Sequence, residues 1–254
     1  MISKGKQKLI RQLGQKKFRT AEGLFVAEGP KVVGDLLRAG FEAEDLFGNT
    51  DFLGTISQGD KQMKIHNQSP CTDEEIAKVS FLQHPQGVIA IFRIPTEQQP
   101  TIGDNTLTLM LDGVQDPGNL GTILRIADWF DIRQIVCSPD TADAFSPKVV
   151  QATMGSIAHV AISYQTLLPF LESLPASYPV YGTLLDGDNI YQQQLSQHGI
   201  IIMGNEGNGI SQLVRQKITR KLLIPSFGAN GAESLNVAVA TAITCSEFRR
   251  VQSS

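Results

Sequence analysis

Along the second half of this 254-residue chain, short and uninterrupted apolar runs alternate with segments of helical periodicity. Apolar runs of this length, bounded by turn residues, are typical of strands that are buried on both faces of a sheet. Such strands are predicted over residues 107–111, 134–137, 160–163, 180–185, 199–203 and 222–224. Helices are predicted over residues 119–130, 147–154 and 167–174, and from about residue 235 onward. This alternation predicts an α/β domain with a doubly wound parallel sheet.

The first part of the chain has a weaker pattern. Residues 23–28 and 86–92 predict two short buried strands, and residues 30–39 predict a helix with a proline in its first turn. Residues 94–106 contain two prolines and many polar residues and follow neither period, as expected of a linker between domains. We therefore expect a small α/β domain over residues 1–95, a linker over 96–106 and the parallel-sheet domain over 107–254.

Composition narrows the class of protein. Hydrophobic residues make up 41% of the chain and charged residues 19%, which is typical of a soluble globular protein. No apolar run approaches the roughly 20 residues that cross a bilayer, and no apolar segment of a secretory signal follows the basic N-terminus. Cys71, Cys137 and Cys245 lie far apart, without metal-ligand spacing, and are expected to be small buried side chains. These features favour a cytoplasmic protein with no metal site.

Positive charge is concentrated at the N-terminus, although the net charge of the chain is −3. Residues 1–19 contain seven basic residues and no acidic one, and these are Lys4, Lys6, Lys8, Arg11, Lys16, Lys17 and Arg19. Such a cluster can neutralise phosphates of a nucleic acid, or it can be a solvated helix that keeps the terminus soluble. The cluster by itself leaves both interpretations open.

Three polar stretches follow predicted strands of the second domain, at the end of the sheet where open α/β folds bind ligands. The first, DGVQDPGNLGTILR, contains Asn119, which suits a helix cap, and Arg125. The second, GNEGNG, has Glu206 at its centre and matches neither a dinucleotide fingerprint nor a P-loop. The third, IPSFGANGAESLN, contains Ser234 and Asn236. Each stretch alone is also compatible with an ordinary turn or helix cap.

Together, the patterns N-x5-R, G-N-E-G-x-G and I-P-…-S-L-N-V-x-V-A resemble the three motifs of the SpoU RNA methyltransferases, in the same order. The resemblance extends from residue 107 to about residue 251. It implies a SPOUT fold, in which the C-terminal part of the sheet domain forms a trefoil knot. It also implies S-adenosyl-L-methionine as cofactor, a ribose 2′-hydroxyl of RNA as substrate, no metal, and a homodimer with each active site at the subunit interface.

The resemblance assigns roles to individual residues. The cofactor-binding positions that it implies are Gly204, Ile224 and Leu235, with Thr183, Leu184, Asn205 and Gly207 as neighbours. The catalytic positions are Asn119, Arg125, Glu206, Ser234 and Asn236. Glu206 is expected to orient Arg125 or Asn119, and Ser234 and Asn236 to position the substrate. Residues 226–233 form a loop about two residues longer than in the family's commonest form, which affects the edge of the cofactor pocket.

Arg125 corresponds to the residue that the family is often said to use as a general base. A guanidinium has a pKa above about 12 and stays protonated, which does not suit a general base. A role in stabilising the forming alkoxide and binding a phosphate is physically more reasonable. The sequence does not decide between the two roles.

The first domain has a resemblance of its own. The stretch FRTAEGLFVAEGPKVV is similar to the F-x-V-E-G-x-K-x-V signature of the ribosomal-protein-like RNA-binding domain found in several ribosomal RNA ribose methylases, with Ala27 inserted. It favours ribosomal RNA over transfer RNA as the substrate and gives the basic residues a role in RNA contact. Two alternative hypotheses for the function are a non-catalytic RNA-binding protein on the same fold and a dinucleotide-dependent enzyme. The absence of a G-x-G-x-x-G sequence argues against the second.

Overall fold

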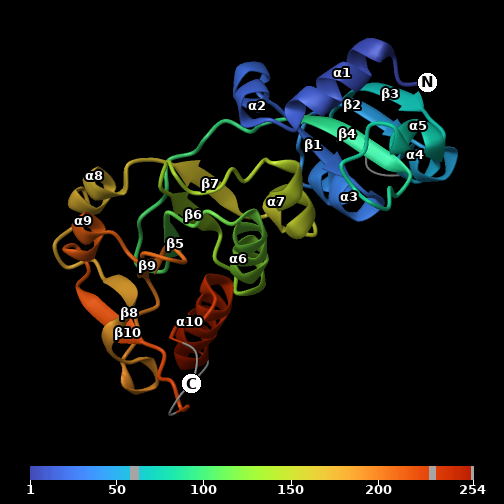
Figure 1. Ribbon diagram of the computed structural model, residues 1–254. Coiled ribbons are helices and arrows are strands. Elements are labelled where there is room, and N and C mark those ends of the chain that lie inside the picture. The colour runs from blue at the N-terminus through green and yellow to red at the C-terminus, as the bar shows by residue number, and fades with distance from the viewer. Residues whose placement is uncertain (58–62, 229–232, 253–254) are drawn as a thin grey trace. The chain divides into compact units, whose positions relative to one another are not determined.

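The structure, a computed structural model, describes residues 1–57, 63–228 and 233–252, and it contains two compact units (Figure 1). Unit 1 comprises Met1–Thr96 and Asp143–His159, and unit 2 comprises Glu97–Ala142 and Val160–Ser254. None of the helices in the described ranges has the length and apolar character that a membrane crossing requires. The three cysteines are unpaired and buried, as predicted.

Unit 1 is built on a mixed four-stranded sheet in the order β1-β4-β2-β3. Its strands are β1 (Leu24–Glu28), β2 (Ala43–Gly48), β3 (Ile65–Pro70) and β4 (Val88–Arg93). β4 is antiparallel to both β1 and β2, whereas β2 and β3 are parallel. The predicted strands at 23–28 and 86–92 are confirmed as β1 and β4. β2 and β3 were not predicted, because charged and polar residues interrupt their apolar pattern.

Helices cover this sheet. They are α1 (Lys4–Leu13), α2 (Lys16–Glu22), α3 (Pro30–Arg38), α4 (Thr50–Ser57) and α5 (Asp73–Ala77). The predicted α3 is confirmed, with Pro30 in its first turn and an apolar face that is fully buried. The buried face of α1 contributes Ile10 and Leu13 to a core that also contains Val26 and Ile91 from the sheet.

A segment from the later part of the sequence completes unit 1. Asp143–His159, which contains α7 (Pro147–Ala152) and the 3-10 helix η1 (Ser156–Ala158), packs against β1 and α3. The ring of Phe145 lies 5.0 Å from that of Phe25, and Arg19 forms an ion pair of 2.5 Å with Asp143. The helix predicted at 147–154 is therefore present. Its period could not reveal that it packs on the first sheet rather than the second.

Unit 2 is built on a six-stranded sheet in the order β10-β8-β9-β5-β6-β7, and every pairing in it is parallel. Its strands are β5 (Leu107–Asp112), β6 (Gln134–Cys137), β7 (Ala161–Tyr164), β8 (Val180–Asn189), β9 (Gly199–Gly204) and β10 (Arg220–Leu223). The predicted parallel α/β domain is confirmed. The central strands β5 and β9 are almost completely buried because helices cover both faces of the sheet.

The helices of unit 2 are α6 (Pro117–Trp129), α8 (Leu167–Glu172), α9 (Gln212–Arg215) and α10 (Val237–Gln252), with the 3-10 helix η2 (Ile190–Gln192). α10 lies alongside α6 (Figure 1), and the guanidinium of Arg249 donates to the carbonyl oxygens of Phe130 and Asp131 at the end of α6. These bonds satisfy carbonyl groups that the end of a helix leaves without a partner. The pairing of α6 with α10 brings the first and third polar stretches together.

Candidate active site

Glu206 is the centre of a hydrogen-bond network at the carboxyl ends of the central strands. It follows β9, the neighbour of β5, and its Oε1 accepts from Nδ2 of Asn119 at 2.9 Å. The same carboxylate accepts from the backbone N–H groups of Gln115 and Asp116, each at 3.3 Å. Glu206 therefore holds the loop that connects β5 to α6.

The surroundings of Glu206 favour its charged form. Partial burial by itself would raise the pKa of this carboxyl group. The hydrogen bonds from Asn119 and from the backbone N–H groups of the Glu206 loop and of Gln115 and Asp116 together outweigh that effect and lower the pKa below its usual value. The anion is thus matched to a set of donors that point at it.

Asn119 connects Glu206 to the third polar stretch. Its Oδ1 accepts from Nδ2 of Asn236 at 2.9 Å. Oδ1 of Asn236 in turn accepts from the backbone N–H groups of Ala238 and Val239 and so caps the beginning of α10. One chain of hydrogen bonds, from Glu206 through Asn119 to Asn236, therefore joins all three stretches.

The cap of α6 differs from the prediction. Asp116, and not Asn119, is the capping residue, and its carboxylate accepts from the backbone N–H of Asn119 at 2.8 Å. Pro117 occupies the first helical position, so the Asp-Pro pair in the sequence was the signal for the helix start. The side chain of Asn119 is free of the capping role and is available for Glu206 and Asn236.

Arg125 lies on α6 and is exposed. Within the described residues it forms no hydrogen bond or ion pair, so the expected contact between Glu206 and Arg125 is not present, whereas the expected contact between Glu206 and Asn119 is. Ser234 is also exposed. A guanidinium that is exposed on the same helix as Asn119 and has no partner among the described residues is suited to bind an anionic ligand.

Asn205 forms a second link between the loops after β5 and β9, which sequence reasoning assigned only to the cofactor's surroundings. Its Nδ2 donates to the carbonyl oxygen of Gly113 at 2.7 Å, and its Oδ1 accepts from the N–H groups of Gly207 and Asn208. Gly113 has a φ of +75°, a conformation that favours glycine. The loop after β5 is thus held by two neighbouring side chains of the Gly204–Gly209 loop.

Gly204 is needed for a reason that the sequence did not reveal. A Cβ atom at this position would lie 2.3 Å from the carbonyl carbon of Gly209 and 2.4 Å from the nitrogen of Ile210. The loop therefore folds back onto Gly204, and a side chain there would collide with backbone before it reached any ligand.

The strand pairing of β8 is interrupted by a register shift. The pairing of β8 with β9 ends at Gly182, and adjacent residues Lys221 and Leu222 of β10 pair with Gly182 and Asp188 of β8. Residues 183–187, which include Thr183 and Leu184, therefore have no partner in the pairing of β8 with β9 or with β10. Backbone groups that bulge from a strand end in this way can bind a ligand.

The remaining expected cofactor positions have different surroundings. Ile224 follows β10 and is partly buried, and Leu235, just before α10, is 48% exposed. The loop that was predicted to be longer, 226–233, lies partly outside the described residues, so its length effect stays a prediction. The described residues contain no group of three or more side chains arranged to hold a metal ion.

The seven basic residues of the N-terminal cluster in unit 1 differ in their contacts. Arg19 is only 3% exposed and donates to Asp143 and to the carbonyl oxygen of Leu13. It therefore stabilises the fold, and the prediction that it contacts RNA is wrong. Lys6 forms an ion pair with Asp45, and Arg11 donates to the carbonyl oxygen of Lys78. The other four basic residues are exposed, and these are Lys4, Lys8, Lys16 and Lys17.

Comparison with known families identifies the class of protein. The SpoU rRNA Methylase family matches residues 106–246, and the MRM3-like substrate binding domain matches residues 5–90. The first match covers more than half of the chain. This chain belongs to the SpoU methylase family.

Individual relatives are similar over almost the whole length. The chain is 32% identical to the 23S rRNA (guanosine(2553)-2′-O)-methyltransferase RlmP of Bacillus subtilis, covering 94% of both chains. A TrmH-family structure from Porphyromonas gingivalis superposes with a TM-score of 0.86 at 41% identity, covering 98% of this chain and 99% of that one. An AdoMet-bound rRNA methyltransferase from Sinorhizobium meliloti superposes with a TM-score of 0.82 at 30% identity, covering 98% and 97%.

Proposed function

We propose that this protein is an S-adenosyl-L-methionine-dependent methyltransferase that methylates a ribose 2′-hydroxyl of ribosomal RNA. The observation that carries the proposal is the hydrogen-bond chain from Glu206 through Asn119 to Asn236, with Arg125 exposed on the same helix as Asn119. RlmP, which is similar over 94% of both chains, is named as a 2′-O-methyltransferase of 23S rRNA. Cytoplasmic location belongs to the same proposal.

The residues of unit 2 fit the cofactor. The backbone of β8 at residues 183–187 falls outside the paired registers, and the tight Gly204 loop lies at the end of the adjacent strand. Backbone N–H and C=O groups with apolar side chains such as Leu184 and Leu235 suit an adenosine and an amino acid moiety. When bound, the cofactor supplies an electrophilic methyl group. The protein's residues must position the ribose and stabilise its oxygen.

Arg125 is the residue proposed to stabilise the ribose oxygen. Methyl transfer requires the 2′-hydroxyl to lose its proton, which in this proposal passes to solvent water, and the guanidinium can stabilise the developing alkoxide and hold the adjacent phosphate with its planar fork. Glu206 and Asn236 act on Asn119 and on the loop before α6, so they position this helix rather than contact Arg125. Ser234, exposed before α10, is proposed to contact the substrate.

We also propose the homodimer and the C-terminal trefoil knot of the family. Unit 2 exposes several large apolar side chains, which a monomer would leave in water. They are Trp129, Leu185, Tyr191, Leu213, Phe227, Leu235 and Val239. The knot is proposed from the family to which the chain belongs. β10, the last strand, lies at the edge of the sheet, and α10, the last helix, packs beside α6. Light scattering at micromolar concentration tests the dimer, and a mass of 27.6 kDa would contradict it.

Unit 1 is proposed to bind the RNA. Lys4, Lys8, Lys16 and Lys17 are exposed and can neutralise phosphates. Changing all four to Gln should weaken RNA binding and make it less dependent on salt, because fewer counterions are released. An unchanged affinity and salt slope would show that these lysines serve solubility alone.

The deciding experiment is methyl transfer by the purified protein. The purified protein is incubated with labelled cofactor and with ribosomal or transfer RNA from cells that lack the protein, with and without EDTA. The modified nucleotide is then mapped. A 2′-O-methyl group in ribosomal RNA, formed also with EDTA, is expected. Modification of transfer RNA alone would support the alternative substrate. Cofactor and RNA binding without methylation of any RNA would support a non-catalytic binding protein.

A further inference from the structure

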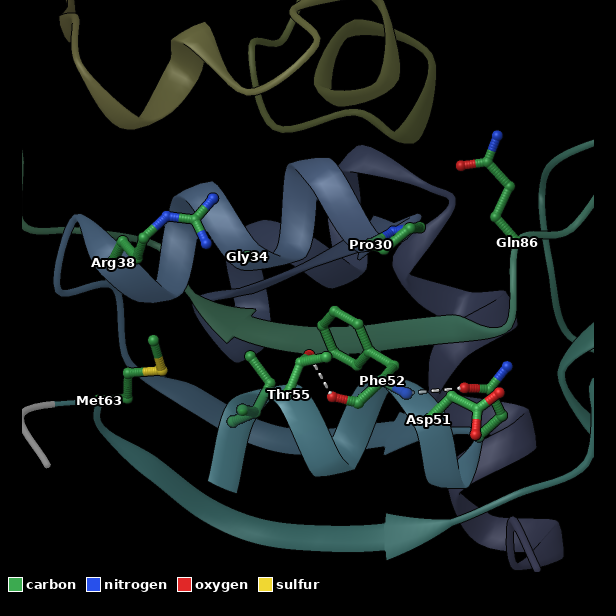
Figure 2. A pocket seen from close by; sticks show the side chains of 10 residues that line it. Pro30, Gly34, Arg38, Asp51, Phe52, Thr55, Met63 and Gln86 are labelled. Carbon is green, nitrogen blue, oxygen red and sulfur yellow. Dashed lines mark hydrogen bonds between the residues drawn. The ribbon is translucent and has the colours of Figure 1, made fainter. Parts of the chain in front are cut away.

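Unit 1 contains a cavity of about 620 Å³ between α3 and α4, which we name the α3–α4 cavity (Figure 2). Apolar side chains, Pro30 from α3 and Phe52 and Ile56 from α4, form part of its wall. Arg38 and Gln86 lie at opposite ends, and the ring of Phe52 lies between them (Figure 2). Its volume lies within the usual range for small-molecule sites.

The α3–α4 cavity combines one aromatic ring with unused polar groups. The amide of Gln86 and the carboxylate of Asp51 form no hydrogen bond with any other described residue. Asn49 is used by the fold, because its Oδ1 accepts from the backbone N–H of Phe52 at the start of α4. A ring for stacking, together with an amide and a carboxylate for hydrogen bonding, matches the face and the edge of a nucleobase.

Charge on α3 favours a phosphate beside the base. Asp35 forms ion pairs with both Lys31, at 2.9 Å, and Arg38, at 2.5 Å. Two cations share one carboxylate, so these three side chains of α3 keep a net positive charge, and Arg38 is the one of them that lines the α3–α4 cavity. The guanidinium of Arg38 has a side-chain exposure of 60% and lies against Gly34, where a Cβ atom would be 3.2 Å from it.

A second hollow in unit 1 lacks these properties. Its lining includes Glu42, Glu44 and Arg93, and Arg93 forms ion pairs with both glutamates. The charge of this guanidinium is therefore neutralised within the protein. The wall holds three carboxylates, those of Glu22, Glu42 and Glu44, and three cations, those of Lys6, Lys64 and Arg93, so it offers a phosphate no net positive charge and is the weaker candidate for a nucleotide.

We propose that the α3–α4 cavity binds one unpaired nucleotide of the RNA substrate. The base stacks on Phe52, its edge meets Asp51 and Gln86, and its phosphate lies beside Arg38. This inference rests on the proposed function and adds a recognition site to it. Contacts to phosphate set affinity and position, whereas contacts to a base set specificity. The exposed lysines of α1 and α2 would then supply general affinity, and the α3–α4 cavity would select the target.

The test uses the full-length protein, a ribosomal RNA transcript that it methylates, and the variant Phe52→Leu, which keeps an apolar side chain and removes the ring. Phe81→Leu is the matched control, because Phe81 is an exposed ring of unit 1 outside the α3–α4 cavity. Loss of one stacked base should raise the KM for RNA roughly 5- to 100-fold. The kcat at saturating RNA and the affinity for the cofactor should stay unchanged. Equal KM values for Phe52→Leu and the unaltered protein would overturn the proposal.

A second measurement does not depend on how a variant folds. The unaltered protein is irradiated with the same transcript containing 4-thiouridine at unpaired positions, and the cross-linked peptides are identified. Cross-links to residues 49–56 are expected, and cross-links confined to other peptides would overturn the proposal. If the unaltered protein methylates no RNA, the proposed function itself fails. If the protein methylates RNA and the KM does not change in the Phe52→Leu variant, the nucleotide site is contradicted and the proposed function is not.

Discussion

Nδ2 of Asn119 donates a hydrogen bond of 2.9 Å to Oε1 of Glu206, a residue 87 positions further along the chain. The sheet brings them together because the strands that precede them, β5 and β9, are parallel neighbours whose carboxyl ends meet at one edge. Asn119 also accepts from Asn236, so a single amide connects three loops. A side chain with both a donor and an acceptor is required at this position.

Replacing Arg125 should reduce methyl transfer without affecting cofactor binding. Arg125→Ala should cost roughly 3–4 kcal/mol of transition-state stabilisation, or about a hundred- to thousand-fold in single-turnover rate. Arg125→Lys should recover part of this loss, because the ammonium keeps the charge and loses the planar fork. Arg133→Ala, which removes an exposed arginine ion-paired with Asp131, is the control and should be close to the unaltered protein. A near-normal rate for Arg125→Ala would exclude both proposed roles.

The pH–rate profiles of the unaltered protein and of the Arg125→Lys variant separate the two roles. If the side chain at this position acts as a general base, the variant should equal or exceed the unaltered protein at high pH, since an ammonium loses its proton more easily than a guanidinium. If Arg125 stabilises the alkoxide, the variant should stay slower across the whole pH range.

The contribution of Glu206 to stability should depend on pH. Its folded-state pKa lies below the ordinary value of 4.5, so the stabilisation by its anion is present above about pH 4.5 and is lost as the pH falls through the lower, folded-state value. Glu206→Gln should therefore lower the Tm at pH 7, and the difference from the unaltered protein should shrink below pH 4.5. Thermal unfolding from about pH 3 to about pH 8 checks this. A difference in Tm that is independent of pH would contradict the role of the charge.

Gly204→Ala should destabilise the protein even when no cofactor is present. The added Cβ atom would approach the backbone of Gly209 and Ile210 to 2.3–2.4 Å, so the loop must move. Gly207→Ala is the matched control for the fold, because its nearest neighbour would be Oδ1 of Asn205 at an ordinary 3.6 Å. We expect a lower Tm for Gly204→Ala alone. Equal Tm values for the two variants would show that the loop is not tightly packed at Gly204.

Replacing only one partner of the buried ion pair between Arg19 and Asp143 should lower the free energy of unfolding. Arg19→Ala leaves the partly buried carboxylate of Asp143 without its partner and should cost about 3 kcal/mol of unfolding free energy. The double variant Arg19→Met, Asp143→Leu should recover part of this loss, because both charges are removed. Arg133→Ala, in an exposed pair, should change the free energy by less than about 1 kcal/mol. Denaturant unfolding measures all three, and equal costs for Arg19→Ala and Arg133→Ala would refute the prediction.

The sequence by itself determined the elements with strong periodicity and the residues of the three polar stretches. The apolar runs of β5, β6 and β9 have no other stable place than the interior of a sheet, so their type and parallel arrangement could be predicted. Asn119, Arg125, Glu206 and Asn236 could be singled out as candidates because their spacing matched a family pattern. The start of α6 was misplaced by two residues, since Asp116 competes with Asn119 for the cap.

Only the tertiary structure decided which partners these residues take. Periodicity shows which face of a helix is buried but not against which sheet, so α7 was assigned to the second domain although its segment packs in unit 1. Charge along the sequence does not show burial, so Arg19 was counted with the exposed lysines although Asp143 holds it inside unit 1. Glu206 was expected to reach Arg125 or Asn119, and the geometry of adjacent strand ends selected Asn119. Such contacts join residues far apart in the chain, and their geometry is set by how whole elements pack, which no local pattern encodes.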